Sequence, residues 1–163
     1  MKHGWLGFLA RPIDGGYRWR GRPLFGHSKT FRGPICVAAG AAAGFAVQES
    51  LLAQLETLGA LAVATPPWWL GALAGAAAEL SELPNSFVKR RLGIEPGGTS
   101  RGALAAVFYA WDQLDLLLGF WLVLACAGVV TPARVVISLL LVGTLHPLST
   151  LCGYLLGMRP TAR

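Results

Sequence analysis

Four long apolar stretches constrain the fold of this chain more than any other feature of the sequence. They begin at Pro34, Trp68, Ala103 and Val135. About 20 apolar residues cross a hydrocarbon core of roughly 30 Å as a helix. The last two stretches, 103–130 and 135–158, meet that length, and the first two are borderline. The pattern predicts an all-α, polytopic helical membrane protein with about four transmembrane helices.

The composition points to the same class of protein. Only 13% of the 163 residues are charged and 54% are apolar, whereas average soluble domains carry roughly 25% charge. The net charge of +6 by itself could suggest a nucleic-acid partner. We expect none, because the basic residues lie between apolar runs and not on one face of a soluble domain. Three cysteines inside apolar stretches give neither a disulfide framework nor zinc-site spacing. We expect no cleaved targeting segment, since the first apolar run is too short for a signal peptide.

Polar segments separate the apolar stretches, and we expect a single membrane domain over residues 1–163. A basic, glycine-rich segment covers 1–33 and precedes the first two spans in 34–83. A second basic, glycine-rich loop covers 84–102, the last two spans lie in 103–158, and a short tail covers 159–163. Pro84 is expected to kink or end the second helix. Thr131 and Pro132 are expected to form the turn between the last two helices.

The distribution of positive charge predicts the orientation. Of the 14 lysines and arginines, 13 lie in the N-terminal segment, the 84–102 loop or the tail, and Arg134 is the exception. Cytoplasmic segments carry an excess of Lys and Arg. We therefore expect an integral protein of the cell (inner) membrane, with both termini, both basic segments and the active site in the cytoplasm.

Carboxylates within the apolar spans are the most informative polar residues. Asp112 and Asp115 lie near the start of the third span, and a separation of three residues places them on one helical face. Glu79 and Glu82 have the same spacing at the end of the second span. Ionisable residues in spans usually face the bundle interior and mark a functional site. The alternative is that these carboxylates are helix-end charges at the membrane interface, paired with Arg90 or Arg101.

The two basic segments carry the complementary charge. The sequence DGGYRWRGRPLFGHSKTFRG combines five glycines with Lys29 and four arginines, so backbone amides and cations can both approach phosphate oxygens. It lacks the GxxxxGK[ST] spacing of a P-loop. The alternative is that these bases hold anionic lipid headgroups, at about 1 kcal/mol per base. With the carboxylates they predict a site for Mg²⁺ and phosphate, because hard divalent cations prefer oxygen ligands and phosphate transfer depends on charge neutralisation.

Three blocks of the sequence resemble the CDP-archaeol synthase family, which is related to the phosphatidate cytidylyltransferases. They are PIDGGYRWRGRPLFGHSKTFRG at 12–33, SFVKRRLGIEPGG at 86–98 and WDQLDLLLG at 111–119. The resemblance implies a small helical membrane bundle surrounded by membrane lipids, with its active site at the cytoplasmic face. It implies Mg²⁺-dependent transfer of CMP from CTP to a lipid phosphate, giving a CDP-lipid and pyrophosphate in phospholipid biosynthesis. Whether the protein forms a homo-oligomer stays open.

The resemblance also implies roles for individual residues. Asp112 and Asp115 correspond to the paired aspartates that hold the metal, and Glu82 occupies the position of a third ligand. Lys89 is the implied catalytic cation, which neutralises the leaving pyrophosphate together with the metal. The implied contacts to the nucleotide phosphates come from Ser86, Lys89 and Arg90. The N-terminal polar signature that binds substrate comprises Asp14, Gly15, Gly16, Lys29, Thr30, Arg32 and Gly33.

Two departures from the family pattern define the alternatives. Family members usually have a Gly-Asp pair where this chain has Ser81 and Glu82, and they usually have five spans. A non-catalytic membrane scaffold or lipid-binding protein derived from the family is the alternative function. A transporter is a third hypothesis, because glycine-rich spans with carboxylates also suit ion pathways, but no internal repeat supports it. The lipid stays open among diether glycerol, diacylglycerol and polyprenyl phosphates.

Overall fold

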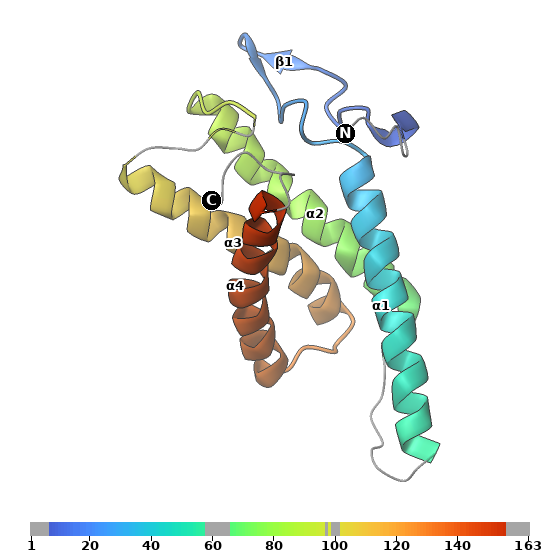
Figure 1. Ribbon diagram of the computed structural model, residues 1–163. Coiled ribbons are helices and arrows are strands. Elements are labelled where there is room, and N and C mark those ends of the chain that lie inside the picture. The colour runs from blue at the N-terminus through green and yellow to red at the C-terminus, as the bar shows by residue number, and fades with distance from the viewer. Residues whose placement is uncertain (1–6, 58–65, 97, 99–101, 156–163) are drawn as a thin grey trace. The chain divides into compact units, whose positions relative to one another are not determined.

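The computed structural model describes residues 7–57, 66–96, 98 and 102–155. Most of them are helical, as the sequence predicted (Figure 1). The helices are α1 (Arg32–Thr57), α2 (Trp68–Arg91), α3 (Ala103–Cys126) and α4 (Pro132–Leu155), and a short 3-10 helix, η1, covers Gly7–Leu9. The expected tail at 159–163, the end of the expected fourth span at 156–158, and residues 97 and 99–101 of the expected loop lie outside the described residues.

The chain forms two compact units, Met1–Val129 and Val130–Arg163. The first contains α1, α2, α3 and a small antiparallel hairpin of β1 (Arg18–Trp19) and β2 (Arg22–Pro23), in which Trp19 pairs with Arg22. The second contains α4, which begins where the backbone N–H of Arg134 donates to the Thr131 hydroxyl at 3.3 Å. Thr131 therefore caps α4, and Pro132 is its first residue and not part of the expected turn.

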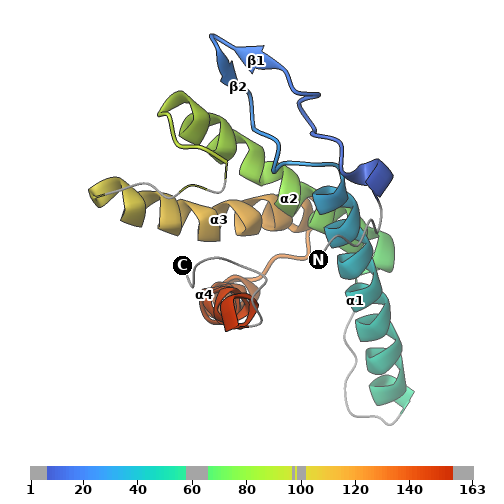
Figure 2. The ribbon, with the colours of Figure 1, turned by 45° about the horizontal axis from the view of Figure 1, so that its top comes forward.

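Helix α2 packs against both α1 and α3 (Figures 1 and 2). Glycines on α2 let it approach α1 closely. A Cβ atom at Gly75 would lie 2.8 Å from both the Ala41 Cβ and the Val37 carbonyl oxygen. A Cβ atom at Gly71 would lie 2.7 Å from the Phe45 ring. Glycines and alanines at such interfaces let helix backbones come close together in a membrane.

A similar close contact joins α2 to α3. A Cβ atom at Gly119 of α3 would overlap the Ala77 carbonyl oxygen and the Ser81 hydroxyl of α2. The Ser81 hydroxyl also lies within hydrogen-bonding distance of two carbonyl oxygens, those of Asp115 and, at 2.6 Å, Ala78, which share its single proton. The buried apolar side chains of the unit lie on these two helices: Leu70, Ala74, Ala78, Phe108, Leu117 and Leu124. The contact brings the polar end of α2 against Asp115.

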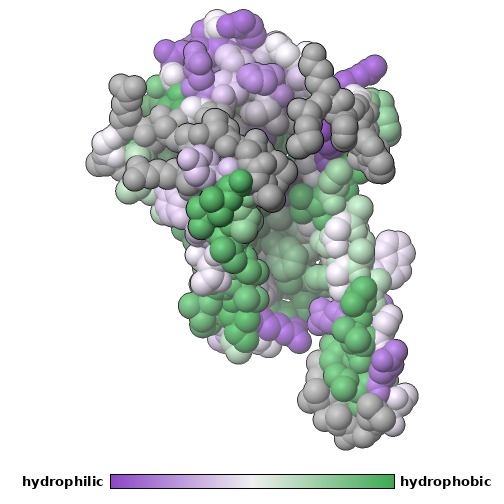
Figure 3. Space-filling model, viewed as in Figure 1, coloured by the Kyte–Doolittle hydropathy of each residue, from purple (hydrophilic) through white to green (hydrophobic). Residues whose placement is uncertain are grey.

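Two of the described helices are long and apolar enough to cross a membrane, Arg32–Thr57 and Leu104–Cys126. Within α4, the part Pro132–Leu145 counts as a shorter apolar helix. The surface of α1 agrees with lipid contact, since Val47, Leu51 and Leu55 are exposed. Hydrophilic side chains instead gather at the hairpin end of the first unit (Figure 3). The count of four spans stays a prediction.

Pro84 does not end the second helix, although an end there was one of the two expected outcomes. Helix α2 continues through Pro84 to Arg91, so the beginning of the segment expected as a loop at 84–102 is helical. A proline removes one backbone donor, and neighbouring polar groups make that loss tolerable in membrane helices. Because the helix continues, Glu82, Asn85 and Lys89 follow one another at spacings of three and four residues and share one face.

The close packing at Gly75 predicts the effect of a small substitution. Gly75→Ala should destabilise the protein by about 1–3 kcal/mol, the usual cost of overpacking, because its Cβ has no space against α1. Gly40→Ala on α1 is the matched control, since nothing lies within 4 Å of its Cβ position. Thermal unfolding of the detergent-solubilised protein measures both. An equal effect of the two substitutions would contradict this α1–α2 contact.

Candidate active site

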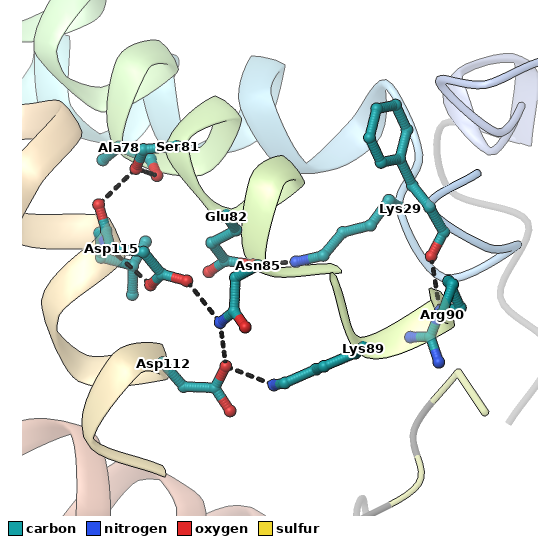
Figure 4. Close-up of polar contacts among 11 residues, drawn as sticks. Lys29, Ala78, Ser81, Glu82, Asn85, Lys89, Arg90, Asp112 and Asp115 are labelled. Atoms are coloured by element: carbon teal, nitrogen blue, oxygen red, sulfur yellow. Dashed lines mark hydrogen bonds and ion pairs between the residues drawn. The ribbon is translucent and has the colours of Figure 1, made fainter. Parts of the chain in front are cut away.

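Two aspartates of α3 and an asparagine of α2 form the centre of the candidate site. The Asn85 side-chain nitrogen donates to Asp112 Oδ1 at 2.6 Å and to Asp115 Oδ2 at 2.9 Å (Figure 4). Because a single nitrogen bonds both carboxylates, their oxygens converge on one point. Asn85 and Asp115 are each 2% exposed, whereas the Asp112 side chain is 43% exposed. The site therefore has a buried side and a side open toward solvent.

Two lysines from different segments neutralise carboxylates at this site. Lys89 of α2 pairs with Asp112 Oδ1 at 2.5 Å. Lys29, from the loop that precedes α1, pairs with Glu82 of α2. Burial lowers the pKa of Lys29 below its usual value, although the nearby carboxylates Glu79, Asp115 and Asp112 act in the opposite direction. The ammonium of Lys29 thus lies within electrostatic reach of the acids of both helices.

Glu79 completes the group of acids that we call the carboxylate cluster, Glu79, Glu82, Asp112 and Asp115. A Cβ atom at Gly33 would overlap the Glu79 carboxylate, so Gly33 lies directly against it at the start of α1. A negative charge is favoured there by the positive end of the helix dipole. Two lysines face four carboxylates, so the site has a formal excess of two negative charges.

One buried oxygen of the site has no hydrogen-bond donor. Asn85 Oδ1 is buried without a partner among the described residues. Turning the amide would place this oxygen against the two aspartates, so the present orientation follows from their charge. Buried polar atoms are nearly always satisfied, and the exceptions call for an ion, a water or a ligand. A cation or an N–H donor beside Asn85 would satisfy this oxygen.

The carboxylates do not form a complete metal-binding set in this conformation. Within the described residues, no three His, Cys, Asp or Glu side chains gather closely enough to hold one ion. Asp112 and Asp115 converge, but Glu82 is paired with Lys29. The chemistry of the donors still fits a hard divalent cation, which prefers carboxylate and amide oxygens.

The N-terminal signature residues have a different role in the local structure. The Asp14 carboxylate accepts hydrogen bonds from the backbone N–H groups of Gly16 at 2.9 Å, Phe25 at 3.0 Å and Gly26 at 3.1 Å. Slight burial raises the Asp14 pKa, but these three hydrogen bonds outweigh it and hold the pKa below its usual value. Gly15 and Gly16 line a separate hollow of about 390 Å³ with Arg11, Pro12, Ile13 and Phe31.

The remaining sequence-predicted residues lie around this centre without meeting at one point. Ser86 is buried on α2, and Arg32 is exposed at the start of α1. Thr30 forms a β-bridge with Pro12 and accepts the backbone N–H of Gly33 at 3.2 Å. Arg90 is 6% exposed and donates to the backbone carbonyls of Phe25 and Ile94. Among the described residues, Arg90 therefore forms no ion pair with the aspartates, and Arg101 lies outside them.

Sequence reasoning missed Asn85. Its position adjoins Ser86 at the beginning of a block already singled out, and the spacing of three from Glu82 and four from Lys89 could have indicated a shared face. The expected break at Pro84 hid that spacing, because a loop carries no helical register.

Comparisons with known proteins identify the family of this chain. The family model described as CarS-like, CDP-archaeol synthase, matches residues 7–162. A CDP-archaeol synthase of Aeropyrum pernix is 40% identical, covering 91% of this chain and 76% of the relative. A CDP-archaeol synthase of Halobacterium salinarum is 35% identical, covering 92% and 82%. A solved structure described as an intramembrane enzyme for archaeal membrane lipids biosynthesis has a TM-score of 0.61 and 29% identity, covering 92% of this chain and 85% of the other.

These similarities define the class first, a helical membrane enzyme of the cytidylyltransferase kind. The chain belongs to the CDP-archaeol synthase family, as its three sequence blocks predicted.

The position of Asn85 predicts how the site responds to charge. Asn85→Asp should lower Tm more than Asn85→Ala, because the first adds a negative charge beside two aspartates while the second only removes the shared donor. Added Mg²⁺ should restore Tm in the Asp variant more than in the Ala variant. Thermal unfolding with a chelator and with Mg²⁺ measures this. Equal losses in both variants, with equal recovery, would contradict the convergence of the two aspartates on Asn85.

Proposed function

We propose that this chain transfers CMP from CTP to a lipid phosphate, producing a CDP-lipid and pyrophosphate. The observation that carries the proposal is the convergence of Asp112 and Asp115 on Asn85, with Lys29 and Lys89 paired to carboxylates beside them. The similarity to CDP-archaeol synthases supports it, since a CDP-lipid is the product that this name describes. Carboxylates and lysines together provide for a cation and for phosphates in one place.

The substrates would be joined by a single displacement. An oxygen of the lipid phosphate attacks the α-phosphorus of CTP, the bond from this phosphorus to the bridging oxygen breaks, and pyrophosphate leaves with that oxygen. Charge builds up on the leaving group, and fixed cations close to it lower the barrier. Lys89 and Lys29 are the two half-buried lysines at the site, so we assign them to the phosphates of CTP. Ser86, Thr30, Arg32 and Gly33 lie on the same segments and are proposed to complete the binding site.

Magnesium is the proposed cofactor. When bound, it would neutralise phosphate charge in the triphosphate of CTP. Asp112 and Asp115 would hold it, with Glu82 as a further ligand, and the excess of negative charge and the unpartnered Asn85 oxygen fit a divalent cation. Glu82 would first have to leave Lys29. Such an exchange suits the proposal, because the released ammonium can then bind a phosphate.

The proposed location is the cell (inner) membrane, with four spans. The two basic segments, both termini and the carboxylate cluster would then face the cytoplasm, where CTP is found. Arg91 at the end of α2 bonds the hairpin of the N-terminal segment, and hydrophilic side chains gather at the hairpin end of the first unit (Figure 3). Both observations support this orientation. The excess of positive charge in these segments agrees with it.

Replacing either aspartate tests the proposed chemistry. Asp112→Asn and Asp115→Asn keep the shape of the side chain but remove a negative charge, and each should lower CTP turnover by orders of magnitude. Glu49→Gln on exposed α1 is the matched control and should keep full activity. The assay follows CTP-dependent CDP-lipid formation with diether and diacylglycerol phosphates over a range of Mg²⁺ concentrations. Near wild-type turnover in both variants would exclude the aspartates from the reaction.

Cysteine labelling tests the orientation. After Cys36, Cys126 and Cys152 are replaced by serine, Glu95→Cys should react with a membrane-impermeant thiol reagent only in opened cells. Ala133→Cys should react in intact cells, or in spheroplasts where an outer membrane is present. Both positions are exposed, so accessibility depends on the side of the membrane. The reverse pattern would exclude a cytoplasmic active site.

A further inference from the structure

We propose that Arg90 and Asp14 do not bind nucleotide phosphate but fix the loop that carries Lys29, so that both are positioning residues. The inference rests on the function proposed above, in which Lys29 binds a phosphate of CTP. We call residues 24–31 the Lys29 loop. Arg90 and Asp14 approach this loop from opposite sides, one from α2 and one from the beginning of the N-terminal signature.

Arg90 donates to main-chain carbonyls through two of its three side-chain nitrogens. Its Nε donates to the Phe25 carbonyl oxygen at 2.9 Å (Figure 4), and one terminal nitrogen donates to the Ile94 carbonyl oxygen. The residue is buried, with 6% of its surface exposed. A buried guanidinium is stabilised when acceptors pair with its donors, and here main-chain carbonyls accept from two of its nitrogens. A phosphate that took over the Nε donor of Arg90 would break its bond to the Lys29 loop.

Asp14 is unsuited to phosphate because it is an anion. Its carboxylate accepts the N–H groups of Phe25 and Gly26 through one oxygen and that of Gly16 through the other. These hydrogen bonds favour the ionised form. A negative carboxylate in this position repels phosphate but holds two successive amides of the Lys29 loop.

Asp14 and Arg90 both form hydrogen bonds to the peptide group between Phe25 and Gly26. Asp14 binds the N–H of Phe25 and of Gly26, while Arg90 binds the C=O of Phe25. Gly26 has φ of 104°, and a Cβ atom there would lie 2.8 Å from Pro96 Cγ and 3.3 Å from Arg90 Nε. Glycine is therefore required, both for the backbone conformation and for the close approach.

These hydrogen bonds fix the backbone from which the Lys29 side chain extends. The Lys29 N–H donates to the Gly26 carbonyl oxygen at 3.1 Å, and the Lys29 carbonyl accepts the N–H of Ile13 at 2.9 Å. From this fixed backbone the side chain extends to Glu82. Lys89 and Arg90 are neighbours on α2, and Lys89 bonds Asp112 while Arg90 bonds the loop. One helix thus places one lysine directly and the other through Arg90.

The adjacent hairpin shows a second contact of the same kind. Arg91 donates to the carbonyl oxygens of Trp19 at 2.6 Å and Pro23 at 2.6 Å. The Trp19 ring stacks on Phe87 of α2 with ring centroids 5.6 Å apart. The arginines at the end of α2 therefore bond the main chain of the N-terminal segment, which is a different use from binding an anion.

A double-mutant cycle separates the two roles of Arg90. Arg90→Lys keeps the charge but replaces the flat fork that reaches two carbonyls, and Lys29→Gln removes the proposed phosphate contact. If Arg90 acts through Lys29, each single variant should lower kcat/KM for CTP by about 10-fold or more, and the double variant should fall little below the worse single one. Multiplying losses would overturn the inference, because they would mean an independent contact of Arg90 with the nucleotide. Arg18→Gln is the control, since Arg18 bonds only Gly21 of its own hairpin among the described contacts.

Hydrogen exchange supplies a readout that does not depend on activity. The amides of Phe25 and Gly26 should exchange faster in Arg90→Lys, and also in Asp14→Asn, in which one of the two acceptor atoms becomes a donor. Arg18→Gln should leave their exchange unchanged. Asp14→Asn also replaces Arg90→Lys in the cycle if the latter does not fold. Unchanged exchange in both Arg90→Lys and Asp14→Asn would overturn the inference. If exchange is faster in these two variants but Lys29→Gln keeps full activity, the proposed role of Lys29 in catalysis is wrong, and the positioning role of Arg90 and Asp14 is still supported.

Discussion

The close approach of α2 and α3 at Gly119 is the contact on which the candidate site depends. The absence of a side chain there lets the Ala77 carbonyl and the Ser81 hydroxyl of α2 lie against α3. Ser81 then bonds the Asp115 main chain, and one helical turn further along α2, Asn85 reaches both aspartates. A larger residue at position 119 would separate the helices, and the two carboxylates would lose the donor that they share. Packing between apolar helices is therefore what positions the polar chemistry.

The site also has to solve an electrostatic problem. Carboxylates within a membrane helix are expensive unless they are paired or face a polar cavity. Here Lys89 and Asn85 compensate Asp112, Asn85 compensates Asp115, and Lys29 compensates Glu82. Compensation is incomplete, since among the described residues Glu79 and Asp115 have no ion-pair partner and the buried Asn85 amide oxygen has no hydrogen-bond donor. The structure thus keeps the acids together while leaving a place that favours a cation.

Much of this arrangement could be predicted from the sequence, and the rest depends on contacts between distant segments. The apolar stretches predicted the helices, and the spacing of Asp112 and Asp115 predicted that they share a face. The resemblance directed attention to Lys29 and Lys89. The part that Asn85 plays could not be predicted, because it required α2 to continue through Pro84 and α3 to approach at Gly119. Neither condition is visible in local sequence patterns.

Arg90 is a residue whose sequence context suggested a role that its contacts in the structure do not support. An arginine in a basic, glycine-rich segment next to Lys89 is typical of a phosphate contact, and the sequence supports that assignment. The helix, however, turns successive side chains about 100° apart, so residues 89 and 90 cannot both face the aspartates. Lys89 meets Asp112, and Arg90 meets the main chain of the Lys29 loop. Under the proposed function, the KRR block therefore contributes one lysine to the substrate, one arginine to the loop that carries the second lysine, and one arginine to the adjacent hairpin.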